Sequence, residues 1–374
     1  MISTLRLGAA AAVTGLALTG LAACGSDADT GDASSSASSS PTAYDTSTLS
    51  TVSDWLAGQT DDGLAHDRQY GFDNYSLSAD IGLGLAAVGG HGDDVTTIAA
   101  AVAKNLKAYV SPGYGTLTSA GSAAKALVLE QTAGAQNVSS LVKTLEGTLA
   151  ESGPSAGRIQ DELDPKNKKA ADYSNTIGQA YAVEGLAAAG SDRAEDATAF
   201  LLDQQCSDGG FRLYFTADPT AKDQTCAGDK ASSSDADVTA YAVLALASLQ
   251  EPSTDVQKSL DSAVSWLVAQ QAADGSYSSA KPKVANADTT GLAAWALGTV
   301  GETDAAEKAA TWVGQHVVTC GKAAGAVAYD DTALTQGEKK GITKTTEGQF
   351  RLATAQALPA LQWLPQGVVE SGSC

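Results

Sequence analysis

The chain has 374 residues and a formal net charge of −20, because 43 Asp and Glu residues outnumber 23 Lys and Arg residues. No basic run follows the first few positions, so nucleic acid and anionic lipid headgroups are excluded as natural electrostatic partners. A chain of this length holds two or three ordinary domains or one large repeat domain.

The first 23 residues have the anatomy of a signal peptide. Arg6 is the only early charge, and the apolar run after it is short for a membrane span. The run ends at Leu21-Ala22-Ala23-Cys24, which resembles the bacterial lipoprotein box. The resemblance implies cleavage before Cys24 and acyl chains on its thiol, which would hold the protein to the membrane on its extracytoplasmic face. The alternative is an ordinary signal peptide followed by an incidental cysteine.

Residues 24–50 are predicted to be a linker. After Cys24 they are mostly Ser, Ala, Thr and Asp with one Pro and no apolar periodicity, a composition typical of a disordered tether. The domain proper is expected over 51–365, and 366–374 form a C-terminal tail.

The cysteines support export. Without Cys24, four remain, an even number that suits an oxidising compartment. Three pairings are possible, and we favour Cys206 with Cys226 and Cys320 with Cys374. Metal ligation would need clustered Cys or His residues, which this sequence lacks, so we expect no metal and no cofactor.

Between residues 51 and 365 we count six pairs of helices, each with an outer and an inner member. The outer helices carry Lys, Glu, Asp and Gln on one side, as helices of an outer layer do. The inner helices are apolar nearly all round, which is typical of helices buried on both sides. They are expected near 77–88, 120–131, 175–189, 237–249, 288–298 and 349–361. Six buried helices inside six amphipathic ones predict a closed double ring.

The turn between outer and inner helices carries a repeated motif. It appears as Phe200-Leu201, Gln205, Gly209 and Phe211, and again as Trp266-Leu267, Gln271, Gly275 and Tyr277. This pattern resembles the prenyltransferase and squalene-cyclase repeat of the α-α toroid superfamily. The resemblance implies an all-α (α/α)6 toroid. It leaves the activity open, because the superfamily includes cyclases, protein prenyltransferases, complement thioester domains and cobalamin carriers.

Polar residues stand at the starts of the inner helices. Because these helices are expected to run parallel, their N-termini should meet at one mouth of the barrel. One interpretation is N-capping and the other is a polar rim that contacts a ligand. The candidate ligand-binding residues are Asp80, Asn175, Asp237, Tyr241, Asp288, Trp295 and Arg351.

An isoprenoid cyclase is one hypothesis. The stretch Asp235-Ala236-Asp237-Val238-Thr239 resembles the cyclase pattern Asp-x-Asp-Asp-Thr, in which a carboxylic acid protonates an alkene. Val238 replaces the adjacent Asp that would help to hold a proton on its neighbour. If the protein is a cyclase or a prenyltransferase-like enzyme, its catalytic residues are Asp235 and Asp237.

Other chemistries of the fold are weaker matches. The zinc ligands of protein prenyltransferases and the thioester motif are missing from the sequence. A carbohydrate-cleaving barrel would need paired carboxylates, which Asp61, Asp62, Asp67 and Asp73 could supply.

Our first functional expectation is therefore a non-catalytic protein that captures a small molecule at the toroid mouth, similar to a cobalamin carrier, and hands it to a membrane transporter. Insertions at 153–171, 212–234 and 321–346 would cover the ligand. The cyclase-like enzyme is the alternative, and a structural envelope protein is the third hypothesis.

Overall fold

A computed structural model describes residues 43–229, 231–279 and 283–370. The internal contacts group the chain into residues 1–41 and 42–374, and everything that follows concerns the second unit. The signal segment, Cys24 and Cys374 lie outside the described residues, so the lipidation of Cys24 and the pairing of Cys320 with Cys374 stay predictions.

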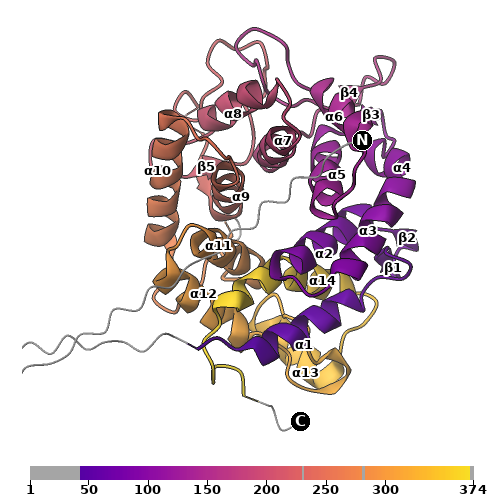
Figure 1. Cartoon of the computed structure of the whole chain (residues 1–374), viewed down its shortest axis with the longest axis vertical. Coiled ribbons are helices and arrows are strands. Elements are labelled where there is room, and N and C mark those ends of the chain that lie inside the picture. Colours follow the sequence, from indigo (N-terminus) through magenta and orange to yellow (C-terminus); the bar gives the residue numbers. More distant parts are fainter. Residues whose placement is uncertain (1–42, 230, 280–282, 371–374) are drawn as a thin grey trace, which may run out of the picture. The chain divides into compact units, whose positions relative to one another are not determined.

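Six helices form the inner layer of this unit (Figure 1). Each packs against the next in chain order, and the last packs against the first, so the ring is closed. These helices are α2 (Tyr75–Val88), α5 (Ala120–Thr132), α7 (Thr176–Ala188), α9 (Ala236–Ala247), α11 (Ala287–Thr299) and α14 (Glu347–Ala357). The predicted α-α toroid is confirmed.

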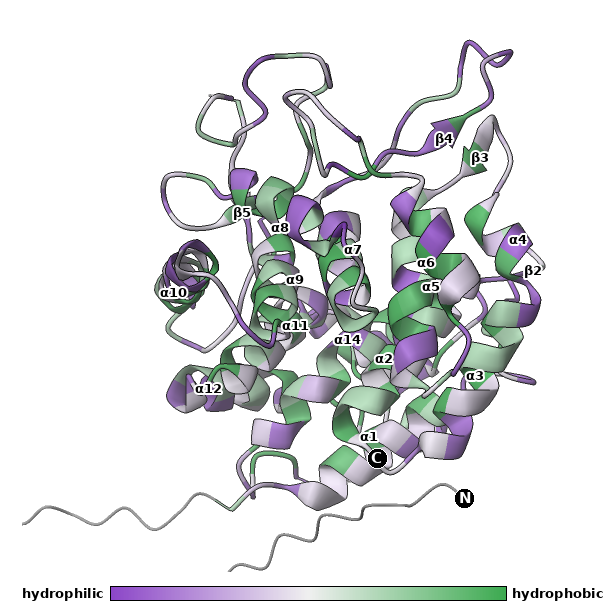
Figure 2. Cartoon of the chain, turned by 45° about the horizontal axis from the view of Figure 1, so that its top comes forward, coloured by the Kyte–Doolittle hydropathy of each residue, from purple (hydrophilic) through white to green (hydrophobic). Residues whose placement is uncertain are grey.

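The outer layer alternates with the inner one along the chain. Its helices bury one side and expose the other, and in Figure 2 the outer helix α10 is strongly polar where the inner helix α9 is largely apolar. The outer helices are α1 (Thr46–Ala57), α3 (Gly92–Lys104), α6 (Ser139–Glu146), α8 (Ala194–Asp203), α10 (Thr254–Gln270) and α12 (Thr303–Gln315). Helix α1 begins at Thr46, earlier than the domain start expected at residue 51.

Shorter elements occupy the loops. Helices α4 (Leu106–Val110) and α13 (Asp331–Lys340) and the 3-10 turns η1 (Gly321–Ala323) and η2 (Leu358–Trp363) supplement the ring. Three antiparallel strand pairs lie in the loops that precede inner helices. They are β1 (His66–Asp67) with β2 (Phe72–Asp73), β3 (Thr116–Thr118) with β4 (Glu162–Leu163), and β5 (Phe211–Arg212) with β6 (Ser234–Asp235).

The repeated Gln and Gly of the sequence motif join neighbouring repeats. The Gln271 side chain donates to Gly275 O (3.2 Å) and to Ala305 O on α12 (2.8 Å). The Gln205 side chain makes the equivalent bonds to Gly209 O and to Ser259 O on α10. Gly275 has a φ of +90°, and a Cβ there would lie 2.3 Å from Lys308 O. The motif is therefore a structural clamp between successive outer helices.

A second repeated bond ties each turn to its inner helix. The N–H of Tyr277 donates to Thr290 Oγ1 (3.0 Å), and the N–H of Phe211 donates to Thr239 Oγ1 (2.9 Å). The hydroxyl of Thr354 accepts from Val327 N in the same way. These buried bonds satisfy backbone groups that would otherwise cost free energy, and they fix the loops over the inner-helix N-termini.

The predicted disulfide between Cys206 and Cys226 is confirmed, and it closes the loop before α9. In the part of the chain that the structure describes, no helix is long and apolar enough to cross a membrane.

Candidate active site

The N-termini of the inner helices gather at one end of the ring, here called the mouth. Ser76, Ser122 and Asn175, from the first turns of α2 and α5 and the N-cap of α7, line a single small cavity. The N-cap side chains of the inner helices are Asn74, Ser119, Asn175, Asp235 and Asn286, and each accepts a backbone N–H of the first turn.

The three other predicted rim carboxyls are not N-caps. Asp237 and Asp288 follow the caps Asp235 and Asn286 by two residues, and Asp80 lies in the second turn of α2. The Oδ1 atoms of Asp237 and Asp288 are buried and have no hydrogen-bond partner among the described residues. Buried polar atoms without partners are rare and call for a functional explanation.

Burial and mutual repulsion favour the protonated forms of these two carboxyls. Burial raises the pKa of Asp237 to about 6, and the charge of Asp235 adds to the effect. Burial raises the pKa of Asp288 to about 7, with further contributions from Asp237 and Asp80. The mouth thus holds carboxylic acids that keep protons near neutral pH, which is the state a general acid needs.

The third carboxyl, Asp80, forms an ion pair with Lys125 of α5. Burial opposes the charge of Lys125, but Asp80 and Tyr109 outweigh it and leave the pKa of Lys125 above its ordinary value. The ammonium also donates to Ser76 Oγ (3.3 Å) and lies 5.9 Å from the centre of the Tyr181 ring. Asp80 is therefore the member of the group that has a basic partner, Lys125.

Asp237 lines a cavity of about 560 Å³ under the loop before α9. Leu213, Tyr214 and Phe215 line it on apolar surface, and the rest of the lining is mostly polar or charged, as at Arg212 and Asp229. Phe215 is held by an edge-on contact with Phe200, at a centroid distance of 5.1 Å. We call this space the mouth cavity, and its volume falls within the range of small-molecule sites.

Arg212 anchors the loop that roofs the mouth cavity. Its buried guanidinium donates to Gln204 Oε1 (2.9 Å) and to Gln224 O (2.6 Å). The disulfide between Cys206 and Cys226 closes the same loop. Arg212 and the disulfide therefore attach the described part of the insertion expected at 212–234 to the turn after α8.

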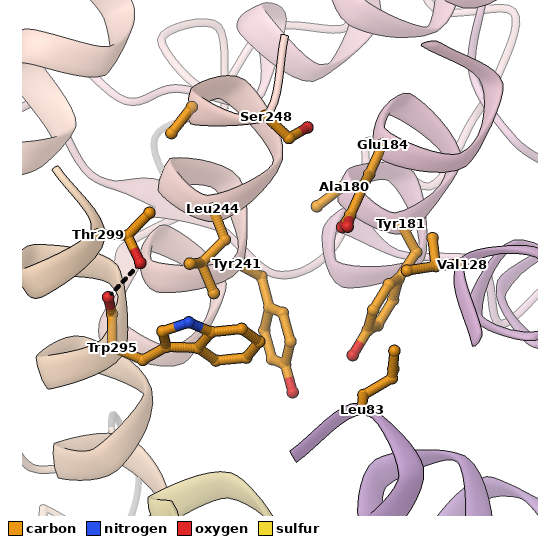
Figure 3. A pocket seen from close by; sticks show the side chains of 11 residues that line it. Leu83, Val128, Ala180, Tyr181, Glu184, Tyr241, Leu244, Ser248, Trp295 and Thr299 are labelled. Atoms are coloured by element: carbon orange, nitrogen blue, oxygen red, sulfur yellow. Dashed lines mark hydrogen bonds between the residues drawn. The ribbon is translucent and has the colours of Figure 1, made fainter. Parts of the chain in front are cut away.

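A second cavity, of about 220 Å³, lies between the C-terminal halves of the inner helices (Figure 3). We call it the inner cavity. Tyr181 and Tyr241 stand side by side at its wall, with ring centroids 5.4 Å apart, and Trp295 lies on the other side of Tyr241. Asp80, Asp237 and Asp288 all act on the phenol of Tyr241, whose pKa burial raises far above its usual value. The tyrosine pair therefore stands between the acids and the inner cavity.

The remaining candidates have different positions. Asn175 is an N-cap at the mouth, and Trp295 lies in the inner cavity rather than on the rim. Arg351 is buried beside Glu347 of the same helix, α14 (3.8 Å), and donates to His66 O (2.8 Å), so it joins α14 to the loop before α2. The structure brings together Asp80, Asp237, Asp288 and Tyr241, and it places the other three around them.

The carboxylates considered for carbohydrate cleavage serve local structure instead. Asp67 accepts the N–H groups of Gln69 and Tyr70, and Asp73 contacts His66 (2.9 Å). Among the described residues, no group of three or more His, Cys, Asp or Glu side chains could hold a metal ion.

One functional candidate was missed by sequence reasoning. Glu184 of α7 lines the inner cavity, and burial raises its pKa to about 7. Its signal in the sequence was a single acidic residue within an otherwise apolar helix, Ala-Tyr-Ala-Val-Glu-Gly-Leu.

Comparison with known proteins gives a fold but no family. A family profile described as the A-macroglobulin TED domain matches residues 155–315. A search of curated protein sequences found no match.

Solved structures resemble the chain over most of its length. A variant of the type II terpene cyclase MstE from Scytonema, in complex with geranylgeranyl dihydroxybenzoate, has a TM-score of 0.57 and 15% identity and covers 85% of this chain and 96% of its own. An unsaturated glucuronyl hydrolase specific for heparin has a TM-score of 0.59 and 12% identity, with coverages of 85% and 95%.

The ent-copalyl diphosphate synthase from Streptomyces platensis is a third relative in fold. Its TM-score is 0.52 at 18% identity, over 77% of this chain and 50% of that one. The class that the fold defines is thus the α-α toroid.

These neighbours contradict our first functional expectation. A non-catalytic carrier was expected because the acid motif is incomplete and aromatic residues are few. The solved structures named above are enzymes, two of them cyclases or synthases of terpenoids. The structure also weakens the two arguments from sequence. Asp237 has no acidic residue next to it at position 238, but its charge acts on Asp288 of the neighbouring helix. Aromatic residues are few, but several of them line the inner cavity and the mouth cavity.

Proposed function

We propose that this protein is an enzyme that cyclises an isoprenoid, with Asp237 as the acid that starts the reaction. One observation carries the proposal. Asp237 is a carboxyl with a raised pKa, and it lines a cavity where Leu213 and Phe215 stand among polar and charged side chains.

The chemistry follows from that placement. The carboxylic acid gives its proton to one carbon of an alkene, whose π electrons form the new C–H bond and leave a cation on the other carbon. A second alkene of the same chain attacks the cation and closes a ring, and loss of a proton restores a neutral product. Phe215 lines the cavity, and the Arg158 guanidinium carbon already lies 5.0 Å from the centre of its ring, so this ring sits where positive charge is tolerated.

Asp288 acts as a positioning residue for the proton. In the cyclase pattern the acid has an adjacent Asp, which Val238 replaces here. Asp288 comes from the next inner helix, and the charge of Asp237 helps to raise the pKa of Asp288, so the two carboxyls are electrostatically coupled. We treat the two carboxyls as one unit that shares a proton.

An isoprenoid substrate also suits the proposed location. Isoprenoid chains dissolve in membranes rather than in water. Acyl chains on Cys24 would keep the enzyme on the membrane from which such a substrate is supplied.

The test uses prenylated phenols and prenyl alcohols of several chain lengths as probes, incubated with the full protein in D2O. We expect a cyclised product that carries one non-exchangeable deuterium, detected by mass spectrometry. Asp237→Asn should lower turnover about 10²-fold or more, because it removes the transferable proton. Turnover should fall as the pH rises above about 6, since Asp237 must be protonated.

The matched control is Asp255→Asn, which makes the same change at an exposed carboxylate on α10. It should leave turnover unchanged. The proposal is wrong if Asp237→Asn retains full turnover, or if none of the probes is converted.

A further inference from the structure

We infer that the inner cavity is a binding site for a compact organic cation of the quaternary ammonium type. Nothing in the proposed cyclisation requires this ligand, and the site lies across the tyrosine pair from Asp237. Four features of the inner cavity support this inference: its aromatic side chains, the carboxyl of Glu184, the C-terminal ends of two helices and its volume.

The walls supply aromatic faces. Tyr181 and Tyr241 come from α7 and α9, and Trp295 comes from α11, the next inner helix, where it lies beside Tyr241 (Figure 3). Leu83 and Val128 complete an otherwise apolar lining. Three aromatic side chains around one space attract a cation through the negative faces of their rings, and Trp and Tyr do so most strongly.

The carboxyl of Glu184 faces the same space. The structure gives it no hydrogen-bond partner among the described residues, so its oxygens are available to a ligand. Burial alone raises its pKa to about 7. The other titratable groups at the walls are the phenols of Tyr181 and Tyr241, beyond which lies the Lys125–Asp80 ion pair. A bound cation would therefore favour the ionised form of Glu184.

The backbone adds negative potential. The inner cavity reaches Ser248 and Thr299 at the C-terminal ends of α9 and α11, where the helix dipole is negative. The hydroxyl of Ser248 donates to Ala245 O (2.8 Å), and that of Thr299 donates to Trp295 O (2.8 Å). Both hydroxyl protons are already used, so these groups offer only lone pairs to a ligand.

The volume sets the size of the ligand. At about 220 Å³ the inner cavity is smaller than the sites of drug-sized molecules. A headgroup-sized cation fits this limit better than a long chain does. With aromatic faces and one carboxylate, the cavity would distinguish ligands by their positive charge rather than by their hydrogen-bonding groups.

The experiment compares choline with 3,3-dimethylbutanol, its neutral isostere, by titration calorimetry on the full protein. We expect saturable choline binding and at least about tenfold weaker binding of the isostere. Glu184→Gln should weaken choline binding about tenfold or more, and Trp295→Leu should weaken it as well. Because choline stays charged at every pH, its affinity should rise between about pH 6 and pH 8 as Glu184 ionises.

Two controls keep the outcome clear. Glu195→Gln removes an exposed carboxylate from the neighbouring helix α8 and should leave binding unchanged. Thermal melting of each variant shows whether it is folded. Equal affinity for choline and its isostere, unchanged affinity in Glu184→Gln, or no saturable choline binding would each overturn the inference. Loss of cyclisation in Asp237→Asn together with intact choline binding would separate this site from the proposed reaction.

Discussion

At the scale of single residues, the interior of the ring is marked by acids that are costly to ionise. Asp237, Asp288 and Glu184 each have a raised pKa because burial removes water from the carboxyl. A fold that keeps such groups gives up stability, which is typical of residues retained for function.

Asp288 allows this cost to be measured. Its folded pKa of about 7 lies above the ordinary value of 3.8, so its ionisation destabilises the folded state. The penalty is absent below about pH 4 and reaches its full size above about pH 7. Asp288→Asn should therefore stabilise the protein at pH 8 by roughly 1–3 kcal/mol and have little effect at pH 4.

Thermal or urea unfolding at the two pH values measures this difference. Asp255→Asn, on the exposed face of α10, controls for the change in net charge. Equal stabilisation at both pH values would show that ionisation of Asp288 is not the cause.

At the scale of elements, the repeat motif is architecture. Gln271 and Gly275 hold the turn after α10 against α12, and the Thr290 hydroxyl holds the same turn against α11. These bonds explain why the motif is easy to recognise and why it says little about the reaction.

Gly275→Ala tests the clamp. The new Cβ would meet Lys308 O of α12, and the φ of +90° would strain any residue but glycine. Gly301 has a similar φ of +89° but open space around it, so Gly301→Ala isolates the backbone strain, about 1–2 kcal/mol. We expect Gly275→Ala to destabilise the protein more than Gly301→Ala, as measured by urea unfolding. Equal losses would mean that close packing against α12 contributes nothing.

At the scale of the whole molecule, the ring is closed by its two ends. Helix α14 packs against α2, and a Cβ on Gly84 would lie 2.5 Å from Ala355 O. Closure brings together carboxyls that are far apart in the sequence.

The predicted anchor belongs to the same scale. Cys24→Ala should move the protein from the membrane fraction to the soluble fraction, because it removes the thiol that would carry the acyl chains. Fractionation of expressing cells with immunoblotting measures the distribution, and the mass of the mature N-terminus identifies the lipid. Retention of Cys24→Ala in the membrane fraction would refute the anchor.

The sequence by itself determined the six helical pairs, the buried inner layer and the pairing of Cys206 with Cys226. Those features depend on local periodicity, on a repeated turn and on cysteines close in the chain, and all three can be recognised in the sequence alone. It also placed Asp80, Asp237 and Asp288 near one end of the ring, since all three lie in the first two turns of inner helices.

The tertiary structure alone decided what those residues face. An inner helix is apolar nearly all round, so its sequence has no polar side from which to infer the direction of a lone Asp or Glu. Only the packing of the helices shows that Glu184 lines the inner cavity. The same packing brings Asp288 close enough to Asp237 for the two carboxyls to interact, although residue 238, next to Asp237 in the sequence, is a valine. Their raised pKa values follow from burial and from contacts between helices, which are properties of the packed ring and not of any single segment.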